Sequence, residues 1–427
     1  MVSYEDIFAR CEGDGGYFGQ FRAAGDRYFT QPVLDSLPGS HMTFGGKECV
    51  MWSINNYLGL AENPDVKAVA LEALSRWGTS APMGARMMSG NTSAHESLEA
   101  ELAAFAGKES SILFNYGYLG VIGTVNALVG PEDVVVIDKL VHASIVDAVT
   151  GAVRDRRHLR VFRHNDMEDL DSVLADVNRT RKGGVLIVTE GVYGMTGDIA
   201  QLDAICEIKD RHEARLFIDD AHGFGVMGAS GRGTGEHFGV ADKVDIYFGT
   251  FAKAFASIGG VSAAPKSVVE WIRYNARTQV FAKALPMVYV KALEKTLELV
   301  KNGDARRERL FEVSRRLSSG LRELGFHVGA VASPIVPVFT PGGGDPRVAM
   351  DWIRFLREEG IFVTGVMYPV IPKGYVEFRM VPSASHEDSD IEQTLRAFQR
   401  LRDEKRLDLG ADWSVIDRLY RDAAVAS

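Results

Sequence analysis

Short apolar runs alternate with amphipathic segments through the middle of the chain. The runs are apolar at successive positions, not at every second one, so helices should cover both faces of the strands that they predict. Strands that alternate with helices in this way favour an α/β fold built on a largely parallel sheet. The pattern predicts strands over residues 111–115, 133–137, 159–162, 184–189, 215–218 and 244–248.

Two helices are predicted ahead of these strands from their end signals. Asn63 is a favourable N-cap and Pro64 suits the first helical position, and apolar residues continue on one face to Trp77. Ser93 and Glu96 have the spacing of a capping box, which predicts a second helix with Ser93 as its N-cap.

The hydrophobic pattern changes after Pro286, where the predicted amphipathic helices are longer and the predicted strands are fewer. There we expect helices to about 301, over 304–324, over 349–358 and over 388–401, and strands near 335–339, 361–364 and 376–380. The predicted regions are an N-terminal arm (1–50), a large domain (51–288), a smaller C-terminal α/β domain (289–403) and a polar tail (404–427).

Composition excludes several classes of partner. The 427 residues include 48 Lys and Arg against 57 Asp and Glu, a net charge of −9, which argues against nucleic acid or an anionic membrane as the main partner. The three cysteines are widely spaced, so we expect a reducing, cytoplasmic location and no disulfide framework. No apolar run approaches the length of a membrane span, and the first residues do not form a secretory signal.

A lysine inside an apolar segment is the first candidate for chemistry. Lys253 follows the last of these strands and lies between Phe251 and Phe255, with Gly259 and Gly260 shortly after. An amine in a desolvated pocket loses its preference for the charged form and becomes a nucleophile, as a Schiff-base lysine must. The alternative is a lysine whose stem lies on apolar surface while its amino group reaches water.

Other polar residues follow the ends of predicted strands, where parallel sheets bind ligands. The turn at Gly117 and Tyr118 leads from a strand into a helix, and a helix N-terminus suits a phosphate. Asp219 is placed to keep a pyridine-type nitrogen protonated, and His142 to stack on a flat ring. Each has a simpler alternative, namely an ordinary turn, an aspartate that caps a turn, and a structural histidine.

One glycine-rich segment is rejected as a nucleotide site. Residues 223–228 fit the dinucleotide-binding pattern, but residues 219–222 separate them from the strand and further glycines stand where a helix should begin. The chain also has no Walker lysine motif and no cluster of metal ligands, so no metal site is predicted.

Taken in order along the chain, these features resemble the α-oxoamine synthase family of pyridoxal 5'-phosphate (PLP) enzymes. The resemblance runs from residues 55–60 to residues 382–386, and its motifs include segments 88–91, 189–198 and 230–233. It implies an aspartate-aminotransferase-like fold (fold type I), with a large, mostly parallel-sheet cofactor domain and a smaller C-terminal domain. It also implies PLP as cofactor and a homodimer with active sites at the interface.

The resemblance gives each catalytic candidate a role. Lys253 would form the Schiff base with PLP, and Asp219 would pair with the pyridine nitrogen. His222 would hydrogen-bond the ring hydroxyl, and His142 would stack on the ring. Arg379 would bind the carboxylate of the amino acid, a task for which a bidentate guanidinium is suited.

The remaining candidates would bind the cofactor phosphate or line the substrate side. By the same resemblance, the backbone at Gly117 and Tyr118 and the Thr250 hydroxyl would hold the phosphate. Glu190 would lie beside the cofactor, and both Glu190 and Asn56 would line the site near the substrate.

The chain departs from the family pattern at two places. Gly194 stands where the family usually has Ser, so one hydroxyl near the ring is missing. The family often has Ser or Thr in segment 280–286, reaching the phosphate of the partner subunit, and here the candidates are Ala282 and Lys283. We expect Lys283 to replace the hydroxyl with a charge contact.

The implied reaction is the decarboxylative condensation of a small amino acid (serine, glycine or alanine) with an acyl thioester. The thioester would be acyl-CoA or an acyl carrier protein, and the product a 2-amino ketone. Lys253 is the expected base, and His142 would orient the carboxylate or the thioester carbonyl. The segment around Lys253 favours a serine palmitoyltransferase-like enzyme.

Several alternatives stay open at this point. Within the family they are 8-amino-7-oxononanoate synthase and 2-amino-3-ketobutyrate ligase, and on the same fold an aminotransferase or aldolase. A non-catalytic partner subunit could dispense with its lysine, so the presence of Lys253, Asp219 and His222 argues against that role. A binding protein without chemistry would have no cofactor absorbance.

Overall fold

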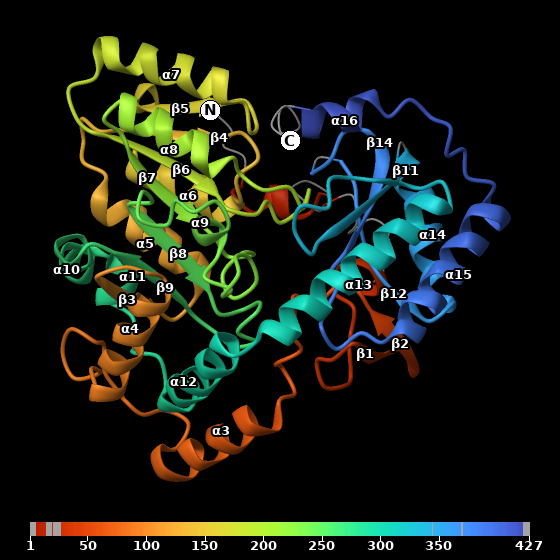
Figure 1. The fold of residues 1–427 in the computed structure, drawn as a ribbon, viewed down its shortest axis with the longest axis horizontal. Helices are drawn as coiled ribbons and strands as arrows, with labels where there is room; N and C mark the ends of the chain where they lie inside the picture. Colours follow the sequence, from red (N-terminus) through yellow and green to blue (C-terminus); the bar gives the residue numbers. More distant parts are fainter. Residues whose placement is uncertain (1–5, 14–18, 20–26, 344, 369, 422–427) are drawn as a thin grey trace.

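The computed structural model describes residues 6–13, 19, 27–343, 345–368 and 370–421. Two lobes lie side by side, one around a seven-stranded sheet and the other around a four-stranded sheet (Figure 1). The long helix α13 (Asp304–Glu323) runs from the first lobe along the second (Figure 1).

The larger sheet confirms the predicted α/β class. Its order is β3 (Ser110–Phe114), β9 (Gly260–Ala264), β8 (Ile246–Thr250), β7 (Arg215–Asp219), β6 (Val185–Glu190), β4 (Val134–Asp138) and β5 (Leu159–Phe162). Only β9 runs antiparallel to its neighbours. The six strands predicted between residues 111 and 248 are present, whereas β9 was not predicted because its small residues lack the bulky apolar pattern of a strand.

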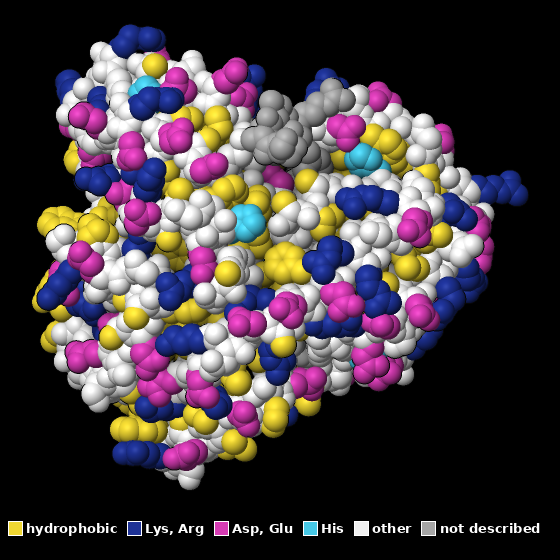
Figure 2. Space-filling model, viewed as in Figure 1, with side chains coloured by type: hydrophobic (Ala, Val, Ile, Leu, Met, Phe, Trp, Pro, Cys, Tyr) yellow, Lys and Arg dark blue, Asp and Glu magenta, His cyan; other side chains and the backbone are white. Residues whose placement is uncertain are grey.

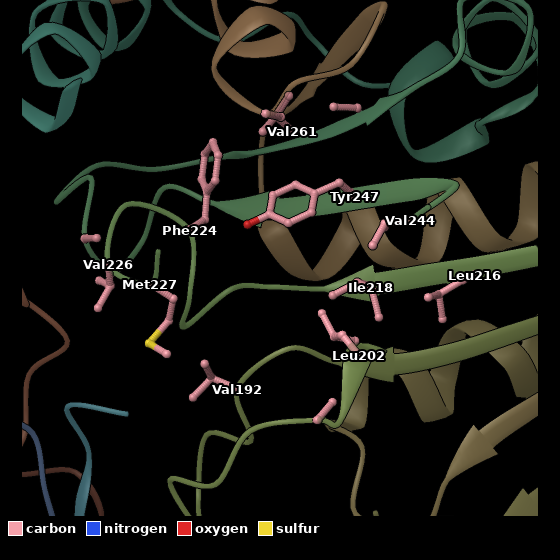
Figure 3. Close-up of a cluster of buried hydrophobic side chains, with 14 of the residues drawn as sticks. Val192, Leu202, Leu216, Ile218, Phe224, Val226, Met227, Val244, Tyr247 and Val261 are labelled. Carbon is pink, nitrogen blue, oxygen red and sulfur yellow. The ribbon is translucent and has the colours of Figure 1, made fainter. Parts of the chain in front are cut away.

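Helices cover both faces of this sheet, as its continuous apolar strands require. On one face the strands pack against α5 (Gly117–Leu128), α6 (Ala143–Ala152) and α10 (Lys266–Asn275), with α11 (Arg277–Val280) beside α5. The other face packs against α4 (Ser93–Phe105), α7 (Met167–Thr180), α8 (Leu202–Arg211) and α12 (Met287–Lys301). Within that core, Tyr247 of β8 lies beside Phe224, with ring centroids 5.6 Å apart, while Leu216 and Ile218 extend from β7 on the side of Leu202 (Figure 3).

The smaller sheet is antiparallel and belongs to the C-terminal lobe. Its order is β10 (His327–Val328), β11 (Val336–Gly343), β14 (Gly374–Met380) and β13 (Thr364–Val366). One core joins it to α13, α14 (Pro346–Glu358) and α15 (Asp388–Lys405). The early strands β1 (His41–Phe44) and β2 (Lys47–Met51) also lie in this lobe, because β2 pairs in parallel with β12 (Ile361–Phe362).

Short elements and one exposed helix complete the described chain. They are η1 (Ala9–Cys11), α2 (Arg27–Thr30), α3 (Pro64–Trp77), η2 (Arg156–His158), α9 (Thr234–His237) and α16 (Ser414–Arg421). Asn63 caps α3 by accepting from the backbone of Asp65, as predicted. Within the described residues, no helix is both long and apolar enough to cross a membrane.

Two local predictions differ from the structure. The N-cap of α4 is Thr92, not Ser93, because the Thr92 side chain accepts from the His95 backbone while Glu96 instead accepts from the Asn91 amide. Residues 404–427 were expected to form a polar tail, yet Ile416 of α16 is fully buried against Phe339 of β11. The predicted boundaries at residues 50, 288 and 403 stay predictions.

Candidate functional site

The candidate site lies along the carboxyl edge of the larger sheet. The neighbouring strands β6, β7 and β8 end at Glu190, Asp219 and Thr250, and Glu190 pairs in register with Asp219. Lys253 follows in the turn after β8. Parallel strands present their last residues at one edge, so the fold brings these four residues together.

Lys253 has the electrostatic character expected of a nucleophilic amine. Burial lowers its pKa to about 8, although Asp219 and Glu190 oppose that shift by favouring the cation. Its amino group forms no ion pair within the described part of the chain. About a tenth of this amine is therefore uncharged at pH 7, far more than for an ordinary lysine.

The two carboxyl groups beside Lys253 are held mainly by backbone donors. Burial, followed by repulsion from Asp219, raises the pKa of Glu190 to about 8, and the backbone N–H of His142 donates to Glu190 Oε1 at 2.6 Å. Burial also raises the pKa of Asp219, while Lys253 and His142 favour its charged form. Asp219 is 5% exposed and has few hydrogen-bond partners, so a cationic ring nitrogen would offset the cost of burying its negative charge.

The two predicted histidines differ in exposure. His142 is exposed and caps α6, with its Nδ1 2.8 Å from Ser144 Oγ. Burial of His222 lowers its pKa well below the ordinary value, with Lys253 as the next cause. His222 Nδ1 lies 2.7 Å from the hydroxyl of Tyr57, which is itself buried.

Gly194 explains one departure from the family pattern. A Cβ atom at this position would lie 2.4 Å from His222 Nε2, so the imidazole occupies the space that a serine side chain would need. The carbonyl oxygen of Gly194 accepts a hydrogen bond from Nε of Arg379 on β14. The loop after β6 thus contacts both His222 and the predicted carboxylate-binding arginine.

A candidate phosphate cradle lies at the start of α5. The N-cap residue Tyr116 provides no side-chain cap, so the first N–H groups of this helix are available to an anion. A Cβ atom at Gly117 would lie 2.6 Å from Thr250 Oγ1, so only glycine permits this approach. The Tyr118 side chain is 41% exposed and bonds to Asp147.

Asn56 and Lys283 do not join the cluster around Lys253, Asp219 and Glu190 in the described interactions. The Asn56 amide is used locally, since Nδ2 donates to Pro38 O at 3.4 Å and Oδ1 accepts from Ala61 N at 3.2 Å. The Lys283 side chain is exposed, and its backbone carbonyl accepts from the Asn115 side chain. Neither residue contacts Lys253 among the described interactions.

Tyr57 was not among the predicted site residues. It lies 165 positions from His222, and only its place within segment 55–60, quoted for the family resemblance, could have indicated it. Burial raises its pKa, while Arg379 favours the ionised form. Tyr57 thus belongs to the site through His222 and Arg379.

Comparison with known proteins gives the family. Residues 47–398 match the family described as aminotransferase class I and II. A cysteate-C-fatty acyltransferase of Capnocytophaga ochracea is 43% identical over 403 residues, covering 93% of this chain and 95% of that protein. This chain belongs to the α-oxoamine synthase family. An 8-amino-7-oxononanoate synthase of Thermoanaerobacter pseudethanolicus is 36% identical over 369 residues, covering 86% of this chain and 91% of that protein.

Solved structures agree with this membership. A serine palmitoyltransferase from S. paucimobilis, with PLP and myriocin bound, has a TM-score of 0.86 at 29% identity over 95% of this chain and 100% of that one. This α-oxoamine synthase therefore has fold type I and depends on PLP, as predicted. The uncapped start of α5, the glycine at its first position and the under-compensated Asp219 fit that cofactor.

Proposed function

We propose that this α-oxoamine synthase condenses a small amino acid with an acyl thioester, releasing carbon dioxide, the free thiol and a 2-amino ketone. The observation that carries the proposal is the juxtaposition of Lys253, Asp219 and Glu190 at one sheet edge, with Arg379 facing them from the other lobe. PLP, when bound, supplies the electron sink that stabilises negative charge at the amino-acid Cα.

The chain's own residues divide the work of the reaction. Lys253 would hold the cofactor covalently, and its amine, when released, would take the proton from Cα; burial lowers its pKa to about 8, toward the uncharged form that a base needs. Asp219 keeps the ring nitrogen protonated, and the N–H groups at Gly117 and Tyr118 with the Thr250 hydroxyl hold the phosphate.

The substrate side is set by the two lobes together. Arg379 binds the amino-acid carboxylate, oriented by its hydrogen bond to the Gly194 carbonyl. Glu190 fixes the backbone of His142, so that the His142 ring can cover the cofactor and orient the carboxylate or the thioester carbonyl. A His142→Phe variant with normal turnover would remove this orienting role, and Asn56 remains a weaker candidate for the substrate side.

The amino acid itself separates two candidates. Serine is the first choice from the segment around Lys253, with glycine and alanine as smaller relatives of it. Cysteate is the second, because a protein 43% identical to this chain is named for it. The thioester is acyl-CoA or an acyl carrier protein.

The visible spectrum of the purified protein tests the proposal. Glycine, alanine, serine and cysteate are titrated in turn, followed by an acyl-CoA. We expect one amino acid to shift the cofactor band and the thioester to change it again, with release of free coenzyme A. A band that an amino acid shifts, without coenzyme A release, would favour an aminotransferase or aldolase. With PLP supplied, the absence of any band would refute the site assignment.

We also propose a homodimer with its active sites at the interface. Large apolar side chains near the phosphate cradle are exposed in one chain, among them Tyr116 at 54% and Phe281 at 79%. Lys283 lies next to them and would reach the partner's phosphate, so Lys283→Ala should weaken cofactor affinity. Light scattering that finds a monomer would contradict the dimer.

The location and other partners follow from composition. Cys49 and Cys206 are buried and form no disulfide within the described residues, which supports the proposed cytoplasmic location. Acidic and basic side chains are interspersed on the face drawn in Figure 2, which offers no basic field for a nucleic acid.

A further inference from the structure

A second cluster of buried charge lies beside the candidate site and is not used by the proposed reaction. His164, between β5 and α7, is 6% exposed. Its Nδ1 lies 2.9 Å from Asp138 Oδ1, and its Nε2 lies 2.8 Å from Asp198 Oδ2. A neutral imidazole has a single N–H and could donate to only one of these carboxylates. With both carboxylates ionised, the geometry fits a doubly protonated imidazolium, which donates to each of them.

The carboxylates around His164 are themselves held in place. Asp138, the last residue of β4, also accepts from the backbone of Leu140 at 2.7 Å and of Asn165 at 2.8 Å. Asn165 has a φ of 54°, a left-handed conformation that turns its N–H toward Asp138. Asp198 accepts from the Thr196 hydroxyl. Burial alone would lower the pKa of His164, but the hydrogen bonds to Asp138 and Asp198 outweigh it and raise the pKa to about 10.

Asp198 lies in the loop that carries the substrate side of the site. The same loop contains Glu190, which accepts from the His142 backbone, and Gly194, whose carbonyl accepts from Arg379. Tyr193 lies between them, edge-on to His164 with ring centroids 4.5 Å apart, and its N–H donates to Asp198 O at 3.0 Å. His164 therefore ties Asp198, and the Tyr193 that it contacts edge-on, to the end of β4.

We propose that His164 is a positioning residue that, as a buried cation, fixes the loop 190–199 so that the Gly194 carbonyl orients Arg379 for the amino-acid carboxylate. The inference rests on the proposed role of Arg379. It predicts that loss of the cation weakens amino-acid binding more than cofactor binding, because Gly117 and Thr250 of the phosphate cradle lie on other strands and helices.

The test measures the dissociation constant of the amino acid from its shift of the cofactor band in the holoenzyme. In His164→Gln we expect the band to remain and the dissociation constant to rise about tenfold or more. The matched control is His212→Gln, since His212 also contacts a carboxylate, Asp171 at 2.9 Å, but lies at the end of α8. A His164→Gln protein with wild-type affinity would overturn the inference.

A milder variant decides the question if His164→Gln does not fold. Asp198→Asn keeps the ring and removes one carboxylate, so the pKa of His164 should fall. The ratio of variant to wild-type affinity should then decrease as the pH rises from 6 to about 9, since the cation is lost above its pKa. A ratio that stays constant across this range would overturn the inference.

Arg379→Lys in the same titration separates this inference from the proposed function. If Arg379→Lys binds the amino acid more weakly while His164→Gln binds it with wild-type affinity, only the positioning role of His164 is refuted. An Arg379→Lys protein with wild-type affinity refutes the carboxylate-binding role of Arg379, and the inference with it.

Discussion

Two clusters of buried charge lie at the same edge of the larger sheet, and they differ in how fully their charges are compensated. His164 has a carboxylate at each ring nitrogen, at 2.9 and 2.8 Å. Glu190 and Asp219 rely on backbone donors, and Lys253 makes no ion pair among the described residues. The pKa values of all three shift toward their neutral forms because burial is the largest cause for each.

The difference separates a cluster that fixes structure from one that is left ready for a ligand. Burying a charge without a partner is costly, and natural proteins tolerate it mainly where function requires it. PLP brings a cationic ring nitrogen and an electrophilic carbon, and it would complete the cluster of Lys253, Glu190 and Asp219. We therefore expect substitutions around His164 to lower mainly the stability of the protein, and substitutions around Lys253 to lower mainly its activity.

The largest effect is expected at Lys253. If Lys253 has the two proposed roles, Lys253→Ala removes both the covalent link and the base, so kcat should fall by about a thousandfold or more. The thermal stability of the PLP-free protein should stay close to that of the wild type, since the lysine has no ion pair to lose. A steady-state assay of coenzyme A release measures the first quantity. Activity within tenfold of the wild type would show that another residue is the base.

A pair of matched substitutions tests the comparison directly. Asp138→Asn leaves buried His164 with one carboxylate, so the free energy of unfolding should fall by about 3–5 kcal/mol. Asp219→Asn removes a buried charge that lacks a full set of partners, so stability should change by less than about 1 kcal/mol or rise. Urea denaturation of the PLP-free proteins measures both. Equal losses would show that the two clusters are compensated alike.

Much of this candidate site could be predicted from the sequence, because the end of each strand can be recognised from the local pattern of residues. The apolar runs ending near Glu190, Asp219 and Thr250 are local patterns, and one rule of parallel sheets brings their last residues together. The family resemblance then supplied the roles. Contacts between distant segments were not accessible, since nothing near Tyr57 or His164 in the sequence specifies which side chain it will meet.

Contacts between distant segments also explain why strand β9 and the burial of Ile416 were not predicted. Strand β9 is formed by small residues whose pairing with β3 and β8, not their own pattern, makes them a strand. The burial of Ile416 depends on the surface offered by β11, which lies far away in the chain. Sequence patterns predict elements well where the signal lies within one segment, and poorly where tertiary packing decides.

Another buried carboxyl extends the comparison, because it lies outside both clusters. Glu377 on β14 is fully buried, and neither oxygen has a hydrogen-bond partner among the described residues. Burial raises its pKa to about 8, although Arg379 opposes the shift. The folded state thus holds a proton that the unfolded chain loses above pH 4.5, so this group makes stability fall as the pH rises to about 8.

Glu377→Gln should remove that dependence. The variant should be more stable than the wild type at pH 8, and the difference should shrink toward pH 5, by up to about 1.4 kcal/mol per pH unit. Unfolding in urea at several pH values measures it. Parallel pH profiles for the two proteins would mean that Glu377 ionises in the folded state as readily as in the unfolded chain.

The smallest effect is expected in the turn that presents Lys253. Ala256 has a φ of 47°, a conformation that costs a residue with a Cβ about 1 kcal/mol, and its N–H donates to Lys253 O at 2.9 Å. Glycine would remove that strain but add about 0.5–1 kcal/mol of backbone entropy to lose on folding. Ala256→Gly should therefore change the melting temperature by less than about 2 °C and leave kcat within about twofold. A tenfold fall in kcat at an unchanged melting temperature would show that Ala256 limits the motion of the turn. The rigid placement of Lys253 would then matter for activity as much as the absence of an ion pair to its amino group.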